Sequence, residues 1–449
     1  MATSSKTFLI ELYREYLEEA SFLYEQRLSL FDDAEVTWKG IGDFEDRFEA
    51  HIDGLVVGGD LALEICVKQA QEGDFGELHS AVRVFCRQNR KDLLLETLKE
   101  VDAEDVQKLQ AVADALKHEL PEQWQAEFVP MLRDGEEKLA FILGVVFGYR
   151  RFKTTNESAT LLTRATPKSL PAIIRTIGRL GDQTAKEPLF RLLTHEQESV
   201  CSAAALALLR LGEERALSCC LQSARSRTWA RLPLALAGGG AAAKEMLDYV
   251  QTGQPDRDSL VALGLLGSPF AVPALIRALG NPEVAATSAT ALQAVTGANL
   301  IETAFVPDEI EGETSVAEPG VVRQPKISIR PDGKPYGLSV TRPSQNPKDW
   351  EKWWAENAKR FKPEIRYRYG QPYSPASLLE TLALETSPHL LRRLAYDEFV
   401  IRYGFDFPFE TDMLVTEQES ALKQCSKWVS TNAARFTPGE SYFAGRLVQ

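Results

Sequence analysis

The sequence is poor in the residue types that catalytic and metal sites use most often. Its 449 residues include 5 histidines and 6 cysteines, and no two cysteines are spaced as Cys-x-x-Cys. The histidines, at 51, 79, 118, 195 and 389, are never within ligand spacing of one another or of a cysteine, so we expect no metal site. Cysteines used in this way are typical of a reducing compartment, where they behave as small buried apolar residues.

Long hydrophobic runs and catalytic motifs are also missing. The longest apolar run, LAFILGVVFGY at 139–149, lies between Lys138 and Arg150 and is too short to cross a bilayer. Near the N-terminus only the three apolar residues Phe8, Leu9 and Ile10 precede a charged stretch, so we expect no signal peptide and a cytoplasmic chain. No nucleophile elbow or zinc-protease motif occurs, and GRLGDQTAK lacks the spacing of a phosphate loop. We therefore expect no catalytic residue, no cofactor and no enzymatic activity.

Charge is unevenly distributed along the chain, whose formal net charge is −13. Residues 1–60 contain 14 acidic and 5 basic side chains, whereas residues 323–372 contain 12 basic and 5 acidic ones. A net negative protein repels nucleic acids and anionic membranes at long range. We therefore expect neither a nucleic-acid partner nor insertion into a membrane.

A repeat of about thirty residues organises the middle of the chain. Similar segments end at Gly181, Gly212, Gly267 and Gly297, with intervals of 31 residues between the first two and 30 between the last two. Glycine ends a helix at low cost because its lack of Cβ permits the left-handed backbone conformation. Small residues follow the first three glycines at a fixed offset of four, namely Ala185, Ala216 and Ala271. Two helices per repeat, stacked on one another, predict an α-solenoid.

The complete chain is predicted to be all-α, with helical ends around this solenoid. Residues 1–74 form an acidic helical region, and residues 75–300 form the solenoid, which is clearest over 170–300. Residues 301–349 are rich in proline and form a linker or a β-hairpin insertion, with a Pro-Asp-Gly turn as the hairpin signal. Residues 350–449 are helical again.

Aromatic and basic residues gather just after the insertion. Trp350, Trp353 and Trp354 recur at helical spacing, and Arg366 and Arg368 follow closely. Tryptophan and arginine are the residue types that contribute most to protein-binding surfaces, so these five are the candidate partner-binding residues. The alternative is that the tryptophans cover the end of the solenoid.

The sequence resembles known families in two respects, in its repeats and in the order of its motifs. The segments GDQTAKEPLFRLLTHEQESVCSAAALALLRLGEERAL and GSPFAVPALIRALGNPEVAATSATALQAVTG resemble short HEAT repeats of the phycobilisome-lyase-like type. The order of RFEAHIDGL, AVTG, WW, YRYGQPYS and LLRRLAYDEFVIRYG resembles an uncharacterised bacterial HEAT-repeat family often encoded in type VI secretion gene clusters. This resemblance implies a cytosolic accessory role near secretion components or their effectors, and it implies no catalytic residues.

Three hypotheses of function follow. The first is a non-enzymatic scaffold or adaptor that holds another protein, because stacked helix pairs form an extended binding surface. The second, suggested only by the repeat type, is a lyase or isomerase that acts on a bilin-like cofactor. The third is a nucleic-acid-binding protein similar to HEAT-like DNA glycosylases, for which residues 323–372 are the only basic candidate surface.

Overall fold

The glycines of the repeat end helices in the computed structural model. Gly181, Gly212, Gly267 and Gly297 have φ values of 71°, 70°, 67° and 59°, all in the left-handed region. The Asp182 side chain accepts a hydrogen bond of 2.9 Å from the N–H of Thr184 and so begins the next turn. The prediction that these glycines are joints between helices is confirmed.

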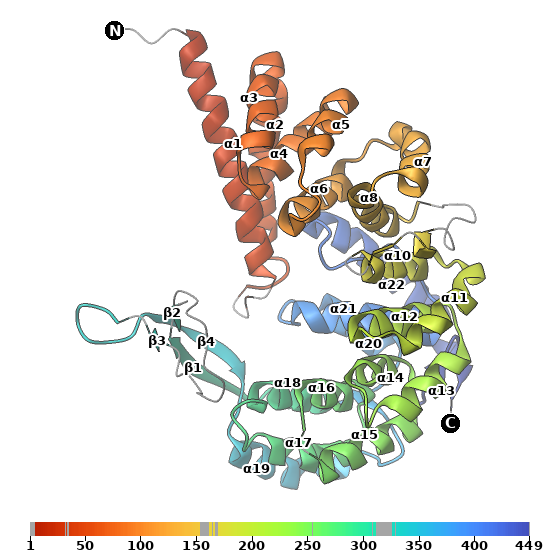
Figure 1. Ribbon diagram of the computed structural model, residues 1–449. Coiled ribbons are helices and arrows are strands. Elements are labelled where there is room, and N and C mark those ends of the chain that lie inside the picture. Colours follow the sequence, from red (N-terminus) through yellow and green to blue (C-terminus); the bar gives the residue numbers. More distant parts are fainter. Residues whose placement is uncertain are drawn as a thin grey trace.

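The structure describes residues 5–31, 33, 36–152, 161–163, 165–166, 169–253, 255–307, 309–310, 326–327 and 329–448. The chain curves into an arc that opens on one side (Figure 1). The inner helices, which line the inside of the arc, are α4 (Phe75–Arg87), α6 (Val106–Glu119), α8 (Glu137–Arg150), α10 (Leu170–Leu180), α12 (Glu198–Arg210), α14 (Arg231–Ala237), α16 (Arg257–Leu266) and α18 (Ala285–Thr296). Each inner helix packs against the next one along the row.

A second row of helices lies on the outside of the arc. It consists of α5 (Lys91–Glu100), α7 (Gln125–Asp134), α11 (Lys186–Arg191), α13 (Glu214–Ser223), α15 (Gly240–Thr252) and α17 (Val272–Ala278). The N-terminal helices α1 (Ser5–Leu30), α2 (Gly42–Val57) and α3 (Gly59–Glu72) pack against α4. The all-α solenoid is therefore confirmed, and its buried core runs from α1 to α18.

Close approach between inner helices depends on small residues. An added Cβ at Gly178 of α10 would lie 2.8 Å from the Cα of Ala207 in α12, so no larger residue fits without a shift. The same contact recurs between Gly264 of α16 and Ala291 of α18, where the corresponding distance is 2.9 Å. Helices this close bury their backbones against each other, which explains the alanine-rich composition of the row.

The proline-rich insertion forms a two-stranded arm. Strand β1 (Ile301–Pro307) pairs antiparallel with β4 (Gly337–Pro343), and β2 (Glu309–Ile310) pairs with β3 (Lys326–Ile327). The predicted Pro-Asp-Gly turn is present, with Gly333 at a φ of 81° and a bridge between Ile329 and Pro335. The long pairing differs from the predicted hairpin, because the strand after the turn pairs with residues that directly follow the solenoid. Residues 311–325 of the insertion lie outside the described part.

The end of the solenoid and the C-terminal region together contain two copies of one structural module. The first copy comprises α17, α18, α19 (Pro347–Asn357) and the hairpin of β5 (Tyr367–Arg368) and β6 (Gln371–Pro372). The second comprises α20 (Pro375–Ala383), α21 (His389–Tyr403), α22 (Val415–Asn432) and the hairpin of β7 (Tyr442–Phe443) and β8 (Arg446–Leu447). The contacts among the three helices and the hairpin follow the same scheme in both copies.

The sequence repeats across these two modules with an offset of 75 residues. The shared residues are Trp353 and Trp428, Asn357 and Asn432, Arg360 and Arg435, Phe361 and Phe436, Pro363 and Pro438, Tyr367 and Tyr442, and Gly370 and Gly445. Their hydrogen bonds repeat as well: the Tyr367 hydroxyl accepts from the N–H of Lys362 at 2.8 Å, and the Tyr442 hydroxyl accepts from the N–H of Thr437 at 2.9 Å. We conclude that the module is duplicated.

Each module ends by capping its own middle helix. The turn residues Tyr369 and Gly370 both have positive φ, as a type I′ turn requires, and their N–H groups donate to carbonyls in the last turn of α18 at 2.7 and 3.0 Å. Ala444 and Gly445 do the same for α21, both at 2.8 Å. These bonds satisfy carbonyl groups that a helix end leaves without partners.

The left-handed joint predicts a specific cost of substitution at Gly181. An added Cβ would have open space around it, so strain in the backbone is the only penalty of Gly181→Val. We expect this change to destabilise the stack by about 1 kcal/mol or more and to lower the midpoint of thermal unfolding. Gly240→Val is the matched control, because its surroundings are equally open and its φ lies outside the left-handed region. Equal melting temperatures for the two variants would contradict the strain at Gly181.

Candidate functional site

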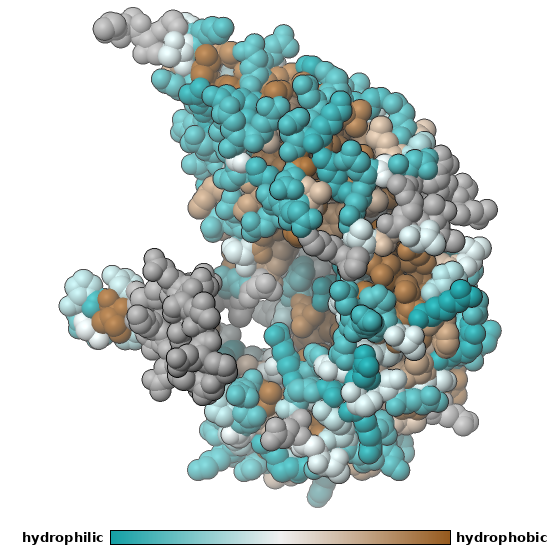
Figure 2. Space-filling model, in the orientation of Figure 1, coloured by the Kyte–Doolittle hydropathy of each residue, from teal (hydrophilic) through white to brown (hydrophobic). Residues whose placement is uncertain are grey.

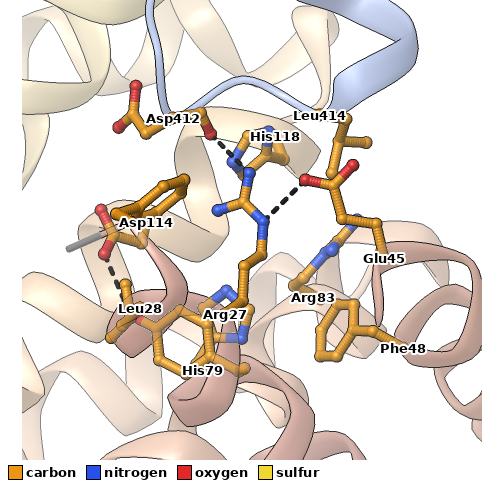
Figure 3. A pocket seen from close by; sticks show the side chains of 12 residues that line it. Arg27, Leu28, Glu45, Phe48, His79, Arg83, Asp114, His118, Asp412 and Leu414 are labelled. Carbon is orange, nitrogen blue, oxygen red and sulfur yellow. Dashed lines mark hydrogen bonds and ion pairs between the residues drawn. The ribbon is translucent and has the colours of Figure 1, made fainter. Parts of the chain in front are cut away.

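A small buried cavity lies where the N-terminal helices meet the segment that precedes α22. It has a volume of about 40 Å³ and is lined by side chains of α1, α2, α4 and α6 together with Asp412 and Leu414 (Figure 3). The ring of Tyr24 stacks on His79 with 3.6 Å between the centroids, and its hydroxyl donates to Asp114 at 2.9 Å. The cavity thus joins the two ends of the described chain.

Ion pairs hold this junction together. Arg27 Nε lies 2.8 Å from Oε1 of Glu45, and an Nη2–H of Arg27 donates to the carbonyl of Asp412 at 2.8 Å (Figure 3). Lys117 Nζ lies 3.0 Å from Oδ2 of Asp412, and the N–H of Val415 donates to Glu45 at 2.7 Å. Burial raises the pKa of the Asp412 carboxyl, but Lys117 outweighs this effect and holds the pKa well below its usual value. The C-terminal segment is therefore fastened to α1, α2 and α6.

Two buried histidines, His79 and His118, lie at the same cavity. The Nδ1 atom of each lacks a hydrogen-bond partner among the described residues. Burial lowers the pKa of both imidazoles well below the usual value, and the neighbouring cations Arg83 and Arg27 lower it further. Both rings are therefore neutral near pH 7, and protonation of either would place another positive charge beside the arginines.

The cavity is small compared with typical ligand pockets. Its volume of about 40 Å³ suits a few water molecules, whereas ligand pockets typically measure roughly 300–1,000 Å³. Within the described ranges, no cluster of three or more metal-ligating side chains occurs. The same ranges contain no helix with both the length and the apolar character needed to cross a membrane. We therefore interpret the cavity as a structural junction.

Two of the predicted partner-binding residues are buried in an ionic cluster. Arg366 and Arg368 are 6% and 0% exposed, and both bind the carboxylate of Glu398, which is 0% exposed. Arg366 also donates to the carbonyl of Leu265 at 2.6 Å, in the last turn of α16. Burial raises the pKa of Glu398, but the guanidinium groups of Arg368, Arg366 and Arg402 outweigh it and keep the pKa below its usual value. The prediction that these two arginines face a partner is wrong, because they fasten the C-terminal region to the solenoid.

The three predicted tryptophans of α19 have different environments. Trp350 is 1% exposed and its Nε1–H donates to the carbonyl of Ser344 at 2.6 Å, so it is a core residue and its place in a partner surface is also wrong. Trp353 and Trp354 are half-buried and stack with 6.4 Å between their centroids. Trp354 packs against the core of the solenoid, and Trp353 lies against Trp354 and Phe361. Partner binding by Trp353 and Trp354 stays a prediction.

Comparison with known proteins identifies one part of the chain. A family model for HEAT repeats matches residues 159–236. That part of the chain is similar to HEAT repeats. No curated protein matches the sequence. The HEAT match includes α10 to α13 and most of α14, and the same stacking of helix pairs continues to α18, beyond the matched residues.

The contacts that the sequence did not reveal are those between distant segments. His79 and His118 are 39 positions apart, and Glu398 lies 32 residues from Arg366, so neither grouping has a motif. Sequence signals did exist for the duplicated module, in the 75-residue offset of Trp-x₃-Asn-x₂-Arg-Phe-x-Pro. From that offset the positions of the two hairpin turns could have been predicted, but not which helices the turns cap.

The buried cluster predicts a large effect at Glu398. Glu398→Gln removes the only carboxylate that pairs with Arg366, Arg368 and Arg402 in the described cluster. We expect a loss of about 3–5 kcal/mol in the free energy of unfolding, because the buried cations remain without their counter-charge. The measurement is urea denaturation followed by circular dichroism. Glu214→Gln is the control, since Glu214 pairs with Arg446 at the surface, and an equal effect in both variants would contradict the prediction.

The two histidines predict a loss of stability in weak acid. Their pKa values are lower in the folded chain than in the unfolded one, so their contribution to stability is constant above about pH 6.5 and falls below it, where only the unfolded chain protonates them. The slope is about 1.4 kcal/mol per pH unit for each such histidine. We expect His79→Phe, which keeps a ring stacked on Tyr24, to reduce the difference in melting temperature between about pH 7.5 and pH 5.5. An unchanged difference, matching that of the half-buried control His195→Phe, would contradict this role of His79.

Proposed function

We propose that the protein is a non-enzymatic, protein-binding scaffold or adaptor of the bacterial cytoplasm, accessory to type VI secretion or its effectors. The observation that carries the proposal is the arm of β1 and β4, which extends away from the arc and exposes apolar side chains (Figures 1 and 2). HEAT repeats are commonly protein-interaction scaffolds, and the interaction class is consistent with the HEAT match. The place in type VI secretion rests on the resemblance of sequence order.

The exposed surface of the arm is rich in apolar side chains. Its exposed large hydrophobic residues are Ile301, Phe305, Val306, Ile329, Tyr336 and Leu338, with exposed fractions from 40% to 60%. Figure 2 shows hydrophobic side chains at the outer end of the arm. Contiguous exposed apolar residues are typical of interaction sites, because soluble proteins otherwise keep such surface small.

The pairing of the arm places apolar side chains on both of its faces. Val306 lies opposite Leu338 on one face, and Phe305 lies on the other. Near the solenoid, the Nε atom of Arg342 is 2.9 Å from Oε1 of Glu302, which closes the base of the arm. A two-stranded ribbon is marginally stable in water by itself. A partner that covers either face would bury apolar area and stabilise the ribbon.

The experiment is cross-linking mass spectrometry on the full chain captured from its source cells. We expect partner peptides linked to Lys334, which lies in the turn of the arm. The double variant Val306→Ser and Leu338→Ser should reduce the yield of arm cross-links at least fivefold. Val57→Ser is the matched control, because Val57 is 86% exposed and lies on α2 in the N-terminal region.

Three outcomes would overturn the proposal. One is the absence of partner peptides together with turnover of a small molecule by the purified chain. Another is a coloured purified protein, which would favour the bilin-type lyase or isomerase. The third is binding to duplex DNA that weakens steeply with salt, since such a slope reports neutralised phosphates.

A further inference from the structure

The two ends of the inner row differ in charge. Residues 1–60, which include α1 and α2, contain 14 acidic and 5 basic side chains, whereas residues 323–372, which include β4 and α19, contain 12 basic and 5 acidic ones. Arg366 and Arg368 of the second range are buried, but its remaining basic side chains still outnumber the acidic ones. Figure 1 shows α1 and the arm at opposite ends of the arc. The uneven charge of the sequence is therefore a difference between the two ends of the molecule.

A groove lies at the acidic end, between α1 and the beginning of α4. It has a volume of about 310 Å³ and is lined by Glu18, Ser21, Phe22, Glu25, Asp74 and Glu77. None of its four carboxylates forms an ion pair with a residue that the structure describes. Burial and the neighbouring carboxylate of Asp74 raise the pKa of Glu25. The groove thus combines carboxylates that lack a cationic side chain with the ring of Phe22, which is 55% exposed.

The outer turn of the arm, residues 329–336, has the complementary chemistry. The N–H of Arg330 donates to the carbonyl of Lys334 at 2.7 Å, which closes the turn. The side chains of Arg330 and Lys334 are exposed, and neither forms an ion pair within the described ranges. The guanidinium of Arg330 lies 5.2 Å from the centre of the exposed Tyr336 ring. The single acidic residue of the turn, Asp332, accepts a hydrogen bond from the N–H of Lys334 at 3.1 Å. The turn therefore presents two cations beside an exposed aromatic ring.

We propose that the outer turn of the arm in one copy of the chain binds the groove between α1 and α4 in a second copy, so that copies associate head to tail. Arg330 and Lys334 pair with the carboxylates of the groove, and the apolar side chains beside them cover Phe22. This inference rests on the proposed scaffold function, and it names one partner of the arm. Because the two surfaces are different parts of the chain, each assembly keeps one free turn and one free groove and can grow beyond a dimer.

The base of the arm favours a second copy over the groove of the same chain. The N–H of Ser344 donates to the carbonyl of Leu300 at 2.8 Å, and the Nε atom of Arg342 lies 2.9 Å from Oε1 of Glu302. These contacts fix the direction in which the ribbon leaves the solenoid. Figure 1 shows the arm extending outward from the arc, with its outer end clear of α1. A second copy can offer its groove to the turn without any bending of the ribbon.

The association is expected to be weak and sensitive to salt. Exposed ion pairs contribute little affinity, but opposite charges on two surfaces speed their encounter and set their orientation. Dissolved ions screen such pairs, so the association weakens as the ionic strength rises. The apolar contact with Phe22 is not screened, because it depends on the area removed from water.

The test is sedimentation velocity of the full chain over a wide range of concentration, at about 0.05 M and about 0.5 M salt. We expect species larger than a dimer at low salt, and at least tenfold weaker association at high salt. The arm variant, Arg330→Glu with Lys334→Glu, and the groove variant, Glu18→Lys with Glu25→Lys, should each associate at least tenfold more weakly. An equimolar mixture of the two should form a dimer again, because the intact turn of the groove variant meets the intact groove of the arm variant.

Lys348→Glu with Lys352→Glu is the matched control for the arm variant. Both lysines are exposed on α19, outside the turn, and their substitution changes the net charge by the same amount. This control should associate as the unmodified chain does. Folding of each variant is checked by its melting temperature, and Phe22→Ser replaces the groove variant in the test if the latter fails to fold.

An unmodified chain that stays monomeric at every concentration in low salt would overturn the inference. Equal association of the unmodified chain and the arm and groove variants would also overturn it, as would a mixture of these variants that stays monomeric. A monomer that becomes more compact at low salt would place the turn in the groove of its own chain and contradict a second copy. None of these results affects the cross-linking of other proteins to the arm, so failure here is distinct from failure of the scaffold function.

Discussion

The structure depends on how the C-terminal ends of the inner helices are satisfied. A helix leaves its last four carbonyl groups without partners inside the helix, and a row of stacked helices brings several such ends to one edge. Arg402 donates to the carbonyls of Ala235 and Gly238 at 2.9 and 3.0 Å at the end of α14. Arg366 does so at the end of α16, and the β5–β6 turn does so at the end of α18. The C-terminal region therefore caps the inner row of helices along this edge.

This capping explains a buried excess of positive charge. Three arginines surround the single carboxylate of Glu398, and all four side chains are almost fully buried. The partial negative charge of the helix C-termini offsets part of the excess, and the Tyr373 ring lies 3.6 Å from the guanidinium of Arg366. Burial among the other cations lowers the pKa of Arg402 to about 10. The arginines therefore link the stability of the solenoid to that of the C-terminal region.

The two copies of the module differ in the segment that follows their middle helix. The second copy closes on itself, because its phenylalanine segment covers Trp428 and Tyr396 binds the edge of the solenoid through Arg151 and Arg210. In the first copy, the arm takes the place of this segment, between the middle helix α18 and the third helix α19. The arm exposes apolar side chains, whereas Trp353 and Trp428 are half-buried alike in the two modules.

The solenoid could be predicted because its constraints are local and periodic. A left-handed joint requires glycine, a close helix contact requires alanine or glycine, and both recur at the repeat length, as Gly181 and Gly178 show. The environments of Trp350 and Arg366 could not be predicted in this way. Tryptophan and arginine recur with the same spacing whether their side chains lie on an exposed surface or are buried against helix ends. A carbonyl 101 residues earlier in the chain decides that Arg366 is buried.

Sequence alone therefore determined the helices, their joints and the place of the insertion, since each follows from residues within one repeat. Tertiary structure alone decided which polar groups meet. His79 and His118 share one cavity, and Glu398 neutralises arginines from separate elements, because folding brings distant segments together at the edge and ends of the row. The same physical reason applies to Trp353 and Trp428: their local sequences are alike, and a segment 23 residues earlier in the chain supplies the Phe405 ring that stacks on Trp428.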